Sequence, residues 1–209
     1  MNLPNGAETA VWTIIPFPPL HTVIIGPVNH LEKALVELCS KEGYDCVGRI
    51  FPKKVPEDNP VLKFERSLNL NKTDYHGKQF EGNQCQDFIK ENNLEKLEGF
   101  LVEDGMPEDL IVNFIDTFRN VRKVYSACCR TKVDPQHRAI TNSFKISYMS
   151  LVNDDRVHLS ITNKVHFIMD HFSDYFEDSL TGGEGLGTTT DQIIEHCHSY
   201  IDRIFRKSR

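Results

Sequence analysis

The stretch PEDLIVNFIDTF, residues 107–118, decides the fold class of this chain. Its large apolar side chains, Leu110, Phe114, Ile115 and Phe118, recur at the spacing of one helical face. The proline that opens the stretch and the two acidic residues behind it are typical of a first helical turn, where carboxylates face the positive end of the helix dipole. The pattern therefore predicts an amphipathic helix and a mainly α protein.

Similar helical patterns flank this stretch on both sides. Behind Pro27, the residues Val28, Leu31, Leu35 and Leu38 recur at helical spacing. Further helices are expected over 83–92, 139–152, 162–176 and, after the N-cap residues 188–191, up to about 205. One strand is expected over 10–16, the apolar run 20–26 fits either a strand or a helix start, and 43–63 is predicted to be a loop with short elements.

The composition fits a globular chain of 209 residues with a net charge of −6, 39% hydrophobic and 26% charged. No apolar run is long enough to span a membrane, and the N-terminus lacks the pattern of a signal peptide. We therefore expect a nuclear or cytoplasmic protein that is not secreted. A protein coating nucleic acid needs a clustered positive face, and the basic residues group only locally, at 119–123 and 203–209.

Cysteine, histidine and aspartate in the segment 128–171 form a candidate metal site. Spacing alone is weak support, because His166 and His171 lie about 140° apart on a regular helix. Without further information, the two histidines fit partly buried side chains with local hydrogen bonds. Cys128 and Cys129 fit small buried hydrophobes, and Asp134 fits a turn or helix cap.

Two carboxylates near the C-terminus form a second candidate site. Asp191 and Glu195 are four residues apart and share one face of the expected last helix. Such a pair can hold Mg²⁺, which prefers oxygen ligands. The alternative is that Asp191 only caps the helix or lies in its first turn.

Five segments occur in a fixed order along the chain: IIPFPPLH (14–21) with Ile25-Gly26, FEGN (80–83), FRNVRKVYSACC (118–129), TNKVH (162–166) with His171, and GLG (185–187) with Thr190-Asp191 and FRK (205–207). In this order they resemble the catalytic core of RAG/Transib-type DNA transposases, the relatives of the V(D)J recombinase. The resemblance spans most of residues 11–207. It implies an RNase H-like α/β fold whose second and third catalytic acids are separated by a long helical insertion.

The resemblance divides the single domain 1–209 into three parts. Residues 1–42 would be a remnant strand and first helix of the RNase H-like core, 43–180 the helical zinc-binding insertion, and 181–209 the C-terminal catalytic-type helix. It also implies structural Zn²⁺ held by Cys129, His166 and His171. Asp134 stands where the family has a fourth, cysteine ligand, and Cys128 could replace Cys129 if the loop shifts by one residue.

The catalytic carboxylates of the family are mostly missing. Pro18 stands at the position of the second aspartate, and the first would precede this chain. Only the third acid remains, as Asp191 or Glu195. Two-metal cleavage needs both ions held by several acids, so we expect no strand cleavage, and Mg²⁺ binding only with residual catalysis.

The resemblance therefore predicts a transposon-derived protein, a degenerate or truncated transposase core without cleavage activity. Its expected partners are DNA, bound weakly, and a second copy of the chain, with no membrane and no small-molecule substrate. One alternative is a domesticated adaptor that binds DNA or protein. The other is an unrelated zinc hydrolase in which His166 and His171 leave a coordination position for water.

Overall fold

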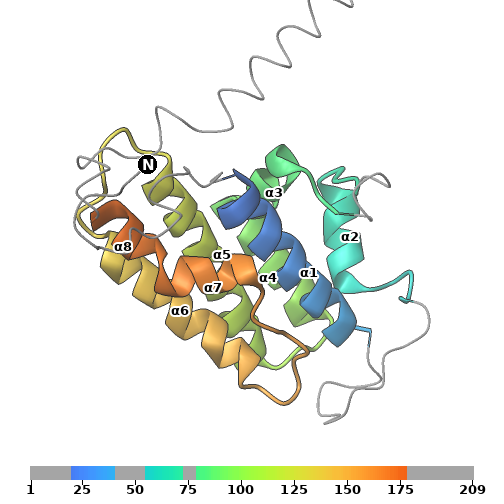
Figure 1. Cartoon of the computed structure of the whole chain (residues 1–209). Helices are drawn as coiled ribbons and strands as arrows, with labels where there is room; N and C mark the ends of the chain where they lie inside the picture. The colour runs from blue at the N-terminus through green and yellow to red at the C-terminus, as the bar shows by residue number, and fades with distance from the viewer. Residues whose placement is uncertain (1–19, 41–54, 73–78, 178–209) are drawn as a thin grey trace, which may run out of the picture.

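The computed structural model describes residues 20–40, 55–72 and 79–177, and within these ranges it is helical with no β-strand (Figure 1). The expectation of a mainly α protein is confirmed for this part of the chain. Whether the helices belong to an RNase H-like fold stays a prediction. The expected strand at 10–16 and the expected last helix lie outside the described residues. The helical elements are η3 (Leu20–Ile25), α1 (Gly26–Leu38), α2 (Pro60–Ser67), α3 (Gly82–Phe88), α4 (Glu91–Glu103), α5 (Glu108–Cys128), α6 (His137–Val152), α7 (Asn163–Asp170) and α8 (Phe172–Glu177).

The run 20–26 is a helix entry rather than a strand. It forms the π-helical η3, which continues directly into α1. Pro27 explains the change of helix type, because a proline in a continuous helix removes a backbone donor and crowds the carbonyl four residues earlier. The side chain of Asn29 donates to the Ile25 carbonyl oxygen over 2.9 Å and so satisfies an acceptor near this irregular point.

The predicted helix at 107–118 is α5, and it extends ten residues further than its first apolar stripe, to Cys128. It packs most extensively against α6, with which it forms an antiparallel hairpin (Figure 1). The buried Asn120 bridges the two helices, since its Nδ2 lies 3.2 Å from the Ser143 carbonyl oxygen and 3.0 Å from the Ser147 hydroxyl. Helix α1 packs against α5, and α7 packs against α6. Helices α1 and α7 also contact each other.

Two of the expected helices are interrupted. The helix expected over 83–92 ends at Phe88, and α4 begins at Glu91. The helix expected over 162–176 divides at His171, whose φ of −124° leaves the helical region. In both places the interruption lets the buried Phe88 and Phe172 point into the core, which local periodicity does not specify.

Helix α4 ends in a glycine motif. Gly105 adopts a φ of 77°, which a residue with a Cβ rarely accepts. Its N–H donates to the Val102 carbonyl, and the Met106 N–H donates to the Leu101 carbonyl. This pair of bonds satisfies the last carbonyls of α4 and turns the chain towards α5.

Candidate functional site

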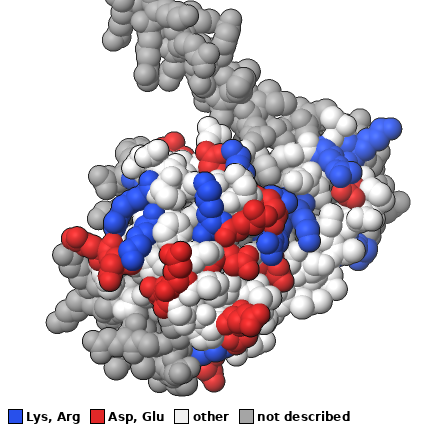
Figure 2. All heavy atoms as spheres, turned by 180° about the vertical axis from the view of Figure 1, so that it is seen from behind, with Lys and Arg blue, Asp and Glu red and all other residues white. Residues whose placement is uncertain are grey.

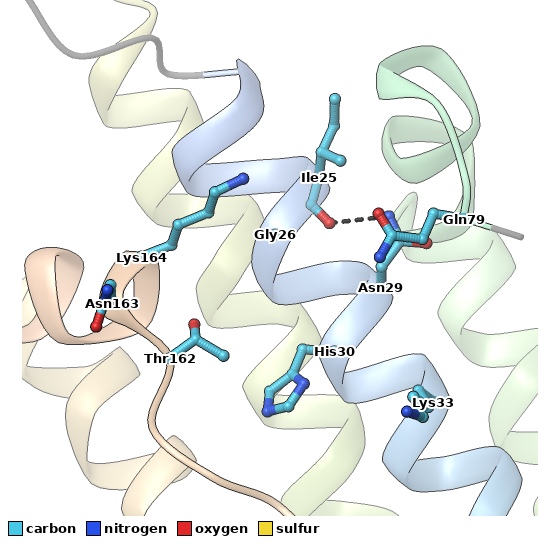
Figure 3. A pocket seen from close by; sticks show the side chains of 9 residues that line it. All are labelled: Ile25, Gly26, Asn29, His30, Lys33, Gln79, Thr162, Asn163 and Lys164. Carbon is cyan, nitrogen blue, oxygen red and sulfur yellow. Dashed lines mark hydrogen bonds between the residues drawn. The ribbon is translucent and has the colours of Figure 1, made fainter. Parts of the chain in front are cut away.

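A polar pocket lies between α1, the start of α7 and the segment before α3 (Figure 3). Its volume of about 430 Å³ falls within the range of small-molecule sites. The lining contains three basic side chains and no carboxylate among the described residues. The lining residues are Ile25, Gly26, Asn29, His30, Lys33, Gln79, Thr162, Asn163 and Lys164.

Two lysines come to this pocket from helices far apart in the sequence. Lys33 lies on α1, and its ammonium is 3.9 Å from a Glu37 carboxylate oxygen. The Lys33 side chain is largely exposed. Lys164 extends from the first turn of α7 towards α1 (Figure 3). Lys164 is exposed and has no ion pair with any described residue. The pocket therefore offers the Lys164 ammonium, which has no ion pair with a described residue, and the Lys33 ammonium, whose ion pair with Glu37 is long at 3.9 Å.

His30 lies between the two helices and is held by the backbone. Its Nε2 is 3.0 Å from the carbonyl oxygen of Ser160, and the Tyr148 hydroxyl donates to the same oxygen over 2.8 Å. A carbonyl only accepts, so Nε2 carries a hydrogen and Nδ1 is left as the second ring position. Burial lowers the pKa of His30, and the hydrogen bond to Ser160 only partly offsets this effect. The lowered pKa favours the neutral ring.

The first turn of α7 adds backbone donors. The Thr162 hydroxyl caps the helix by accepting from the Val165 N–H over 3.3 Å. The N–H groups of Asn163 and Lys164 precede the first intrahelical bond and have no acceptor among the described residues. Backbone donors at a helix start favour an anion, and here they accompany the basic side chains of the pocket.

Asn29 ties the pocket to the core. Its Oδ1 accepts from the Phe80 N–H over 2.7 Å, and its Nδ2 lies 3.1 Å from the Phe80 carbonyl oxygen. These bonds attach the segment 79–81 to α1 and place Gln79 at the pocket edge (Figure 3). The wall that carries His30 and Lys33 is therefore fixed by a buried polar network.

On the same helix, Glu32 is buried in an acidic pair. The Lys72 ammonium lies 2.7 Å from Glu32 Oε1 and 3.1 Å from Glu65 Oε1, and both carboxylate side chains are under a tenth exposed. Burial, together with the neighbouring Glu65 and against the attraction of Lys72, raises the pKa of Glu32 to about 8. One lysine thus serves two buried carboxyl groups, and a proton on Glu32 relieves their repulsion.

This pair predicts a pH dependence of stability. The folded-state pKa of Glu32 lies above its ordinary value of 4.5, so the folded state binds the extra proton. The free energy of unfolding should therefore fall as the pH rises from about 4.5 through 8, by at most about 1.4 kcal/mol per pH unit. Urea unfolding of the wild type and of Glu32→Gln across this range would measure it. An equal slope of unfolding free energy against pH in both proteins would contradict the raised pKa of Glu32. Contributions from other groups, such as His30, are the same in both proteins and cancel in the comparison.

The two predicted histidine ligands lie together, at the end of α7. The rings of His166 and His171 meet edge to face with centroids 5.0 Å apart. His166 Nδ1 is also 2.9 Å from Asp170 Oδ2, and Asp170 pairs with Lys145 at 2.6 Å. The break in the helix at His171 brings the rings closer than a regular helix would.

The other two predicted ligands are in local contacts. Cys129 caps the end of α5, and its N–H donates to the Tyr125 carbonyl oxygen. Asp134 is buried, accepts from the Gln136 N–H over 2.9 Å and lies 3.3 Å from Arg130. Among the described residues, no three His, Cys, Asp or Glu side chains are grouped so as to hold a metal ion.

Cys128, the alternative ligand, is fully buried, and burial raises the pKa of its thiol well above the ordinary range. It packs as a core hydrophobe in the described structure. The predicted carboxylates Asp191 and Glu195, and Pro18, lie outside the described residues. Zinc binding and a vestigial catalytic acid therefore stay predictions.

The pocket could not be predicted from the sequence, because its two walls are far apart in the chain. His30 and Lys33 are three residues apart and share one face of α1, but an isolated His and Lys on a helix usually face solvent. Only packing places them opposite Lys164, more than 130 positions later, beside the connection from α6. A local signal does exist in Thr162, which caps α7 as an N-cap threonine should.

Comparison with protein-family models, with curated proteins and with solved structures found no match. Among the described residues, no helix combines the length and the apolar character needed to cross a membrane. The candidate site therefore has to be interpreted from its own chemistry.

Proposed function

We propose that this chain is a transposon-derived helical module that binds DNA through its phosphates and does not cleave it. The transposon origin rests on the order of the resembling segments. The observation that carries phosphate binding is the presence of Lys33, Lys164 and His30 in the lining of one pocket that contains no carboxylate among the described residues. Ammonium groups and free backbone N–H groups are the donors that hold phosphate oxygens.

The face shown in Figure 2 carries no broad basic patch. In the view of Figure 2, lysine and arginine side chains alternate with aspartate and glutamate, and no broad face of one sign is visible. The local basic group at 119–123 is largely occupied, because Arg119 and Arg122 bind Glu91 at 2.7 Å and 2.9 Å. DNA would therefore meet a few cations at the pocket instead of a continuous positive stripe.

Binding to labelled DNA should be weak and only moderately sensitive to salt. With about two phosphates neutralised, log K should fall with log salt at a slope of about −1.4 to −1.8. The double variant Lys33→Gln/Lys164→Gln should lose most of the affinity. Lys96→Gln is the matched control, because Lys96 is an exposed lysine of α4 that does not line the pocket.

The same preparations test cleavage. With Mg²⁺ or Mn²⁺ added, we expect no nicking of duplex or hairpin DNA. Nicking that is abolished by Asp191→Ala or Glu195→Ala would show a working catalytic centre and overturn the non-cleaving part of the proposal. Equal DNA binding by the double variant and by Lys96→Gln would overturn the role of the pocket.

Metal analysis tests the zinc prediction separately. If Cys129, Asp134, His166 and His171 hold structural zinc, the purified protein should contain one ion, and chelation should lower the unfolding temperature. A protein without zinc, or one whose unfolding is unchanged after verified metal removal, would contradict the prediction. The DNA-binding proposal does not depend on this outcome, because none of the four residues lines the pocket.

A further inference from the structure

We propose that the pocket selects a phosphate monoester, such as the phosphorylated end of a DNA strand or a free mononucleotide, over the phosphodiesters inside a strand. This inference rests on the proposed phosphate-binding function of the same pocket. It concerns which phosphate enters, and it is carried by the state of His30 and by the shape and charge of the lining.

His30 distinguishes the two kinds of phosphate by their protons. With Nε2–H committed to the Ser160 carbonyl oxygen at 3.0 Å, the neutral ring presents a lone pair at Nδ1. No described residue bonds to Nδ1. A phosphodiester at neutral pH has no proton, so its oxygens only accept and would be repelled by that lone pair.

A phosphate monoester can satisfy the same nitrogen. Its second pKa is about 6, so near neutral pH it can supply one proton. That proton lies either on the phosphate oxygen, donating to Nδ1, or on Nδ1, donating to the dianion. In both arrangements one hydrogen joins the two groups and the total charge is the same. With a diester the only place for that proton is Nδ1 itself, in a partly buried ring whose charged form costs free energy, whereas a monoester offers a second place on its own oxygen.

The charges around the pocket fit a dianion. Lys33 and Lys164 supply two ammonium groups, and the first-turn N–H groups of α7 supply further donors. The other titratable groups near His30 are Glu37 on the same helix and His158 on the connection before α7. His158 Nδ1 lies 3.5 Å from Glu37 Oε2. Glu37 thus has both His158 and Lys33 beside it, and none of these contacts engages Lys164.

The size of the pocket also favours a terminal group. A hollow of about 430 Å³, bounded by two helices and the segment at Gln79, is of small-molecule size. A strand end brings one flanking nucleotide to this hollow, whereas an internal phosphate brings two.

The test compares ligands that differ only in the end group. Single-stranded oligonucleotides of one sequence, carrying a 5′-phosphate, a 3′-phosphate or hydroxyl ends, are titrated against the full chain at pH 7. A free deoxynucleoside monophosphate is titrated in parallel. We expect one phosphorylated end to bind on the order of tenfold more tightly than the hydroxyl-ended strand, as for a charge-assisted hydrogen bond. His30→Gln and Lys164→Gln should remove this preference, and Lys96→Gln should keep it.

The outcomes separate the two proposals. Equal binding of phosphorylated and hydroxyl-ended strands would overturn the monoester inference and leave DNA binding intact. Binding of the mononucleotide but of no strand would support the inference and overturn the DNA function. No binding of any ligand would overturn both. If His30→Gln does not fold, Lys164→Gln decides alone, because the exposed Lys164 makes no ion pair with the described residues, and a phosphorus NMR shift of the bound end group in the wild type gives an independent measurement.

Discussion

Replacing Lys72 with methionine is expected to lower the free energy of unfolding at pH 9 by about 3–5 kcal/mol, the usual cost of leaving a buried charge without its partner. Lys72 is the cation shared by Glu32 and Glu65, at 2.7 Å and 3.1 Å. Methionine keeps most of the side-chain length but removes the ammonium, whose Nζ also lies 5.0 Å from the centroid of the Phe80 ring. Urea unfolding followed by circular dichroism would measure the loss.

The origin of this loss can be checked with a second substitution. At pH 5 the deficit should be smaller than at pH 9, because at pH 5 Glu32 carries its proton in the folded state with or without Lys72. Combining Lys72→Met with Glu32→Gln should restore much of the stability at pH 9, since the amide removes the carboxyl group that must otherwise stay charged or take up a proton. A deficit that is independent of pH and not rescued by Glu32→Gln would show that Lys72 acts through packing alone.

Replacing Phe88 with alanine is expected to cost about 3–5 kcal/mol, the usual range for a fully buried aromatic side chain. The ring of Phe88 has edge or tilted contacts with three others, with centroids 5.2 Å from Phe64, 5.8 Å from Phe80 and 5.1 Å from Phe118. These rings come from α2, the segment before α3, and α5. One substitution therefore loosens three parts of the fold together.

Chemical unfolding of Phe88→Ala should show a lower midpoint with a similar slope if the transition stays cooperative. Phe88→Leu should lose less, because it keeps most of the apolar volume. Val102→Ala is the matched control on α4, since Val102 is 60% exposed and its loss should stay within about 0.5 kcal/mol. Similar losses in Phe88→Ala and Val102→Ala would contradict the central place of this aromatic cluster.

The two sites differ in how far the sequence could predict them. The resemblance named His166 and His171 as ligands, although their spacing alone favoured ordinary histidines, and the structure brings their rings together. Their relation to Cys129 and Asp134 depends on how the connection between α5 and α6 folds, and spacing does not specify it. The phosphate pocket was not predicted, because His30 and Lys164 approach each other only when α1 and α7 pack.

The sequence by itself determined the helical character of the described chain. The stripe at Leu110, Phe114 and Phe118, and the similar stripe behind Pro27, are local patterns, and a helical period of 3.6 residues converts them directly into buried faces. Helix starts were also readable where a threonine or proline stands, because capping involves only neighbouring residues.

Only the tertiary structure decided the chemistry. Glu32 stands beside Leu31 in a helix and could as well have faced water, yet packing buries it with Glu65 and Lys72. His30 is two residues before Glu32 but lines the pocket, where its Nε2 lies 3.0 Å from the Ser160 carbonyl oxygen. Burial and charge pairing depend on distances between segments that are remote in the chain, and helical periodicity carries no information about those distances.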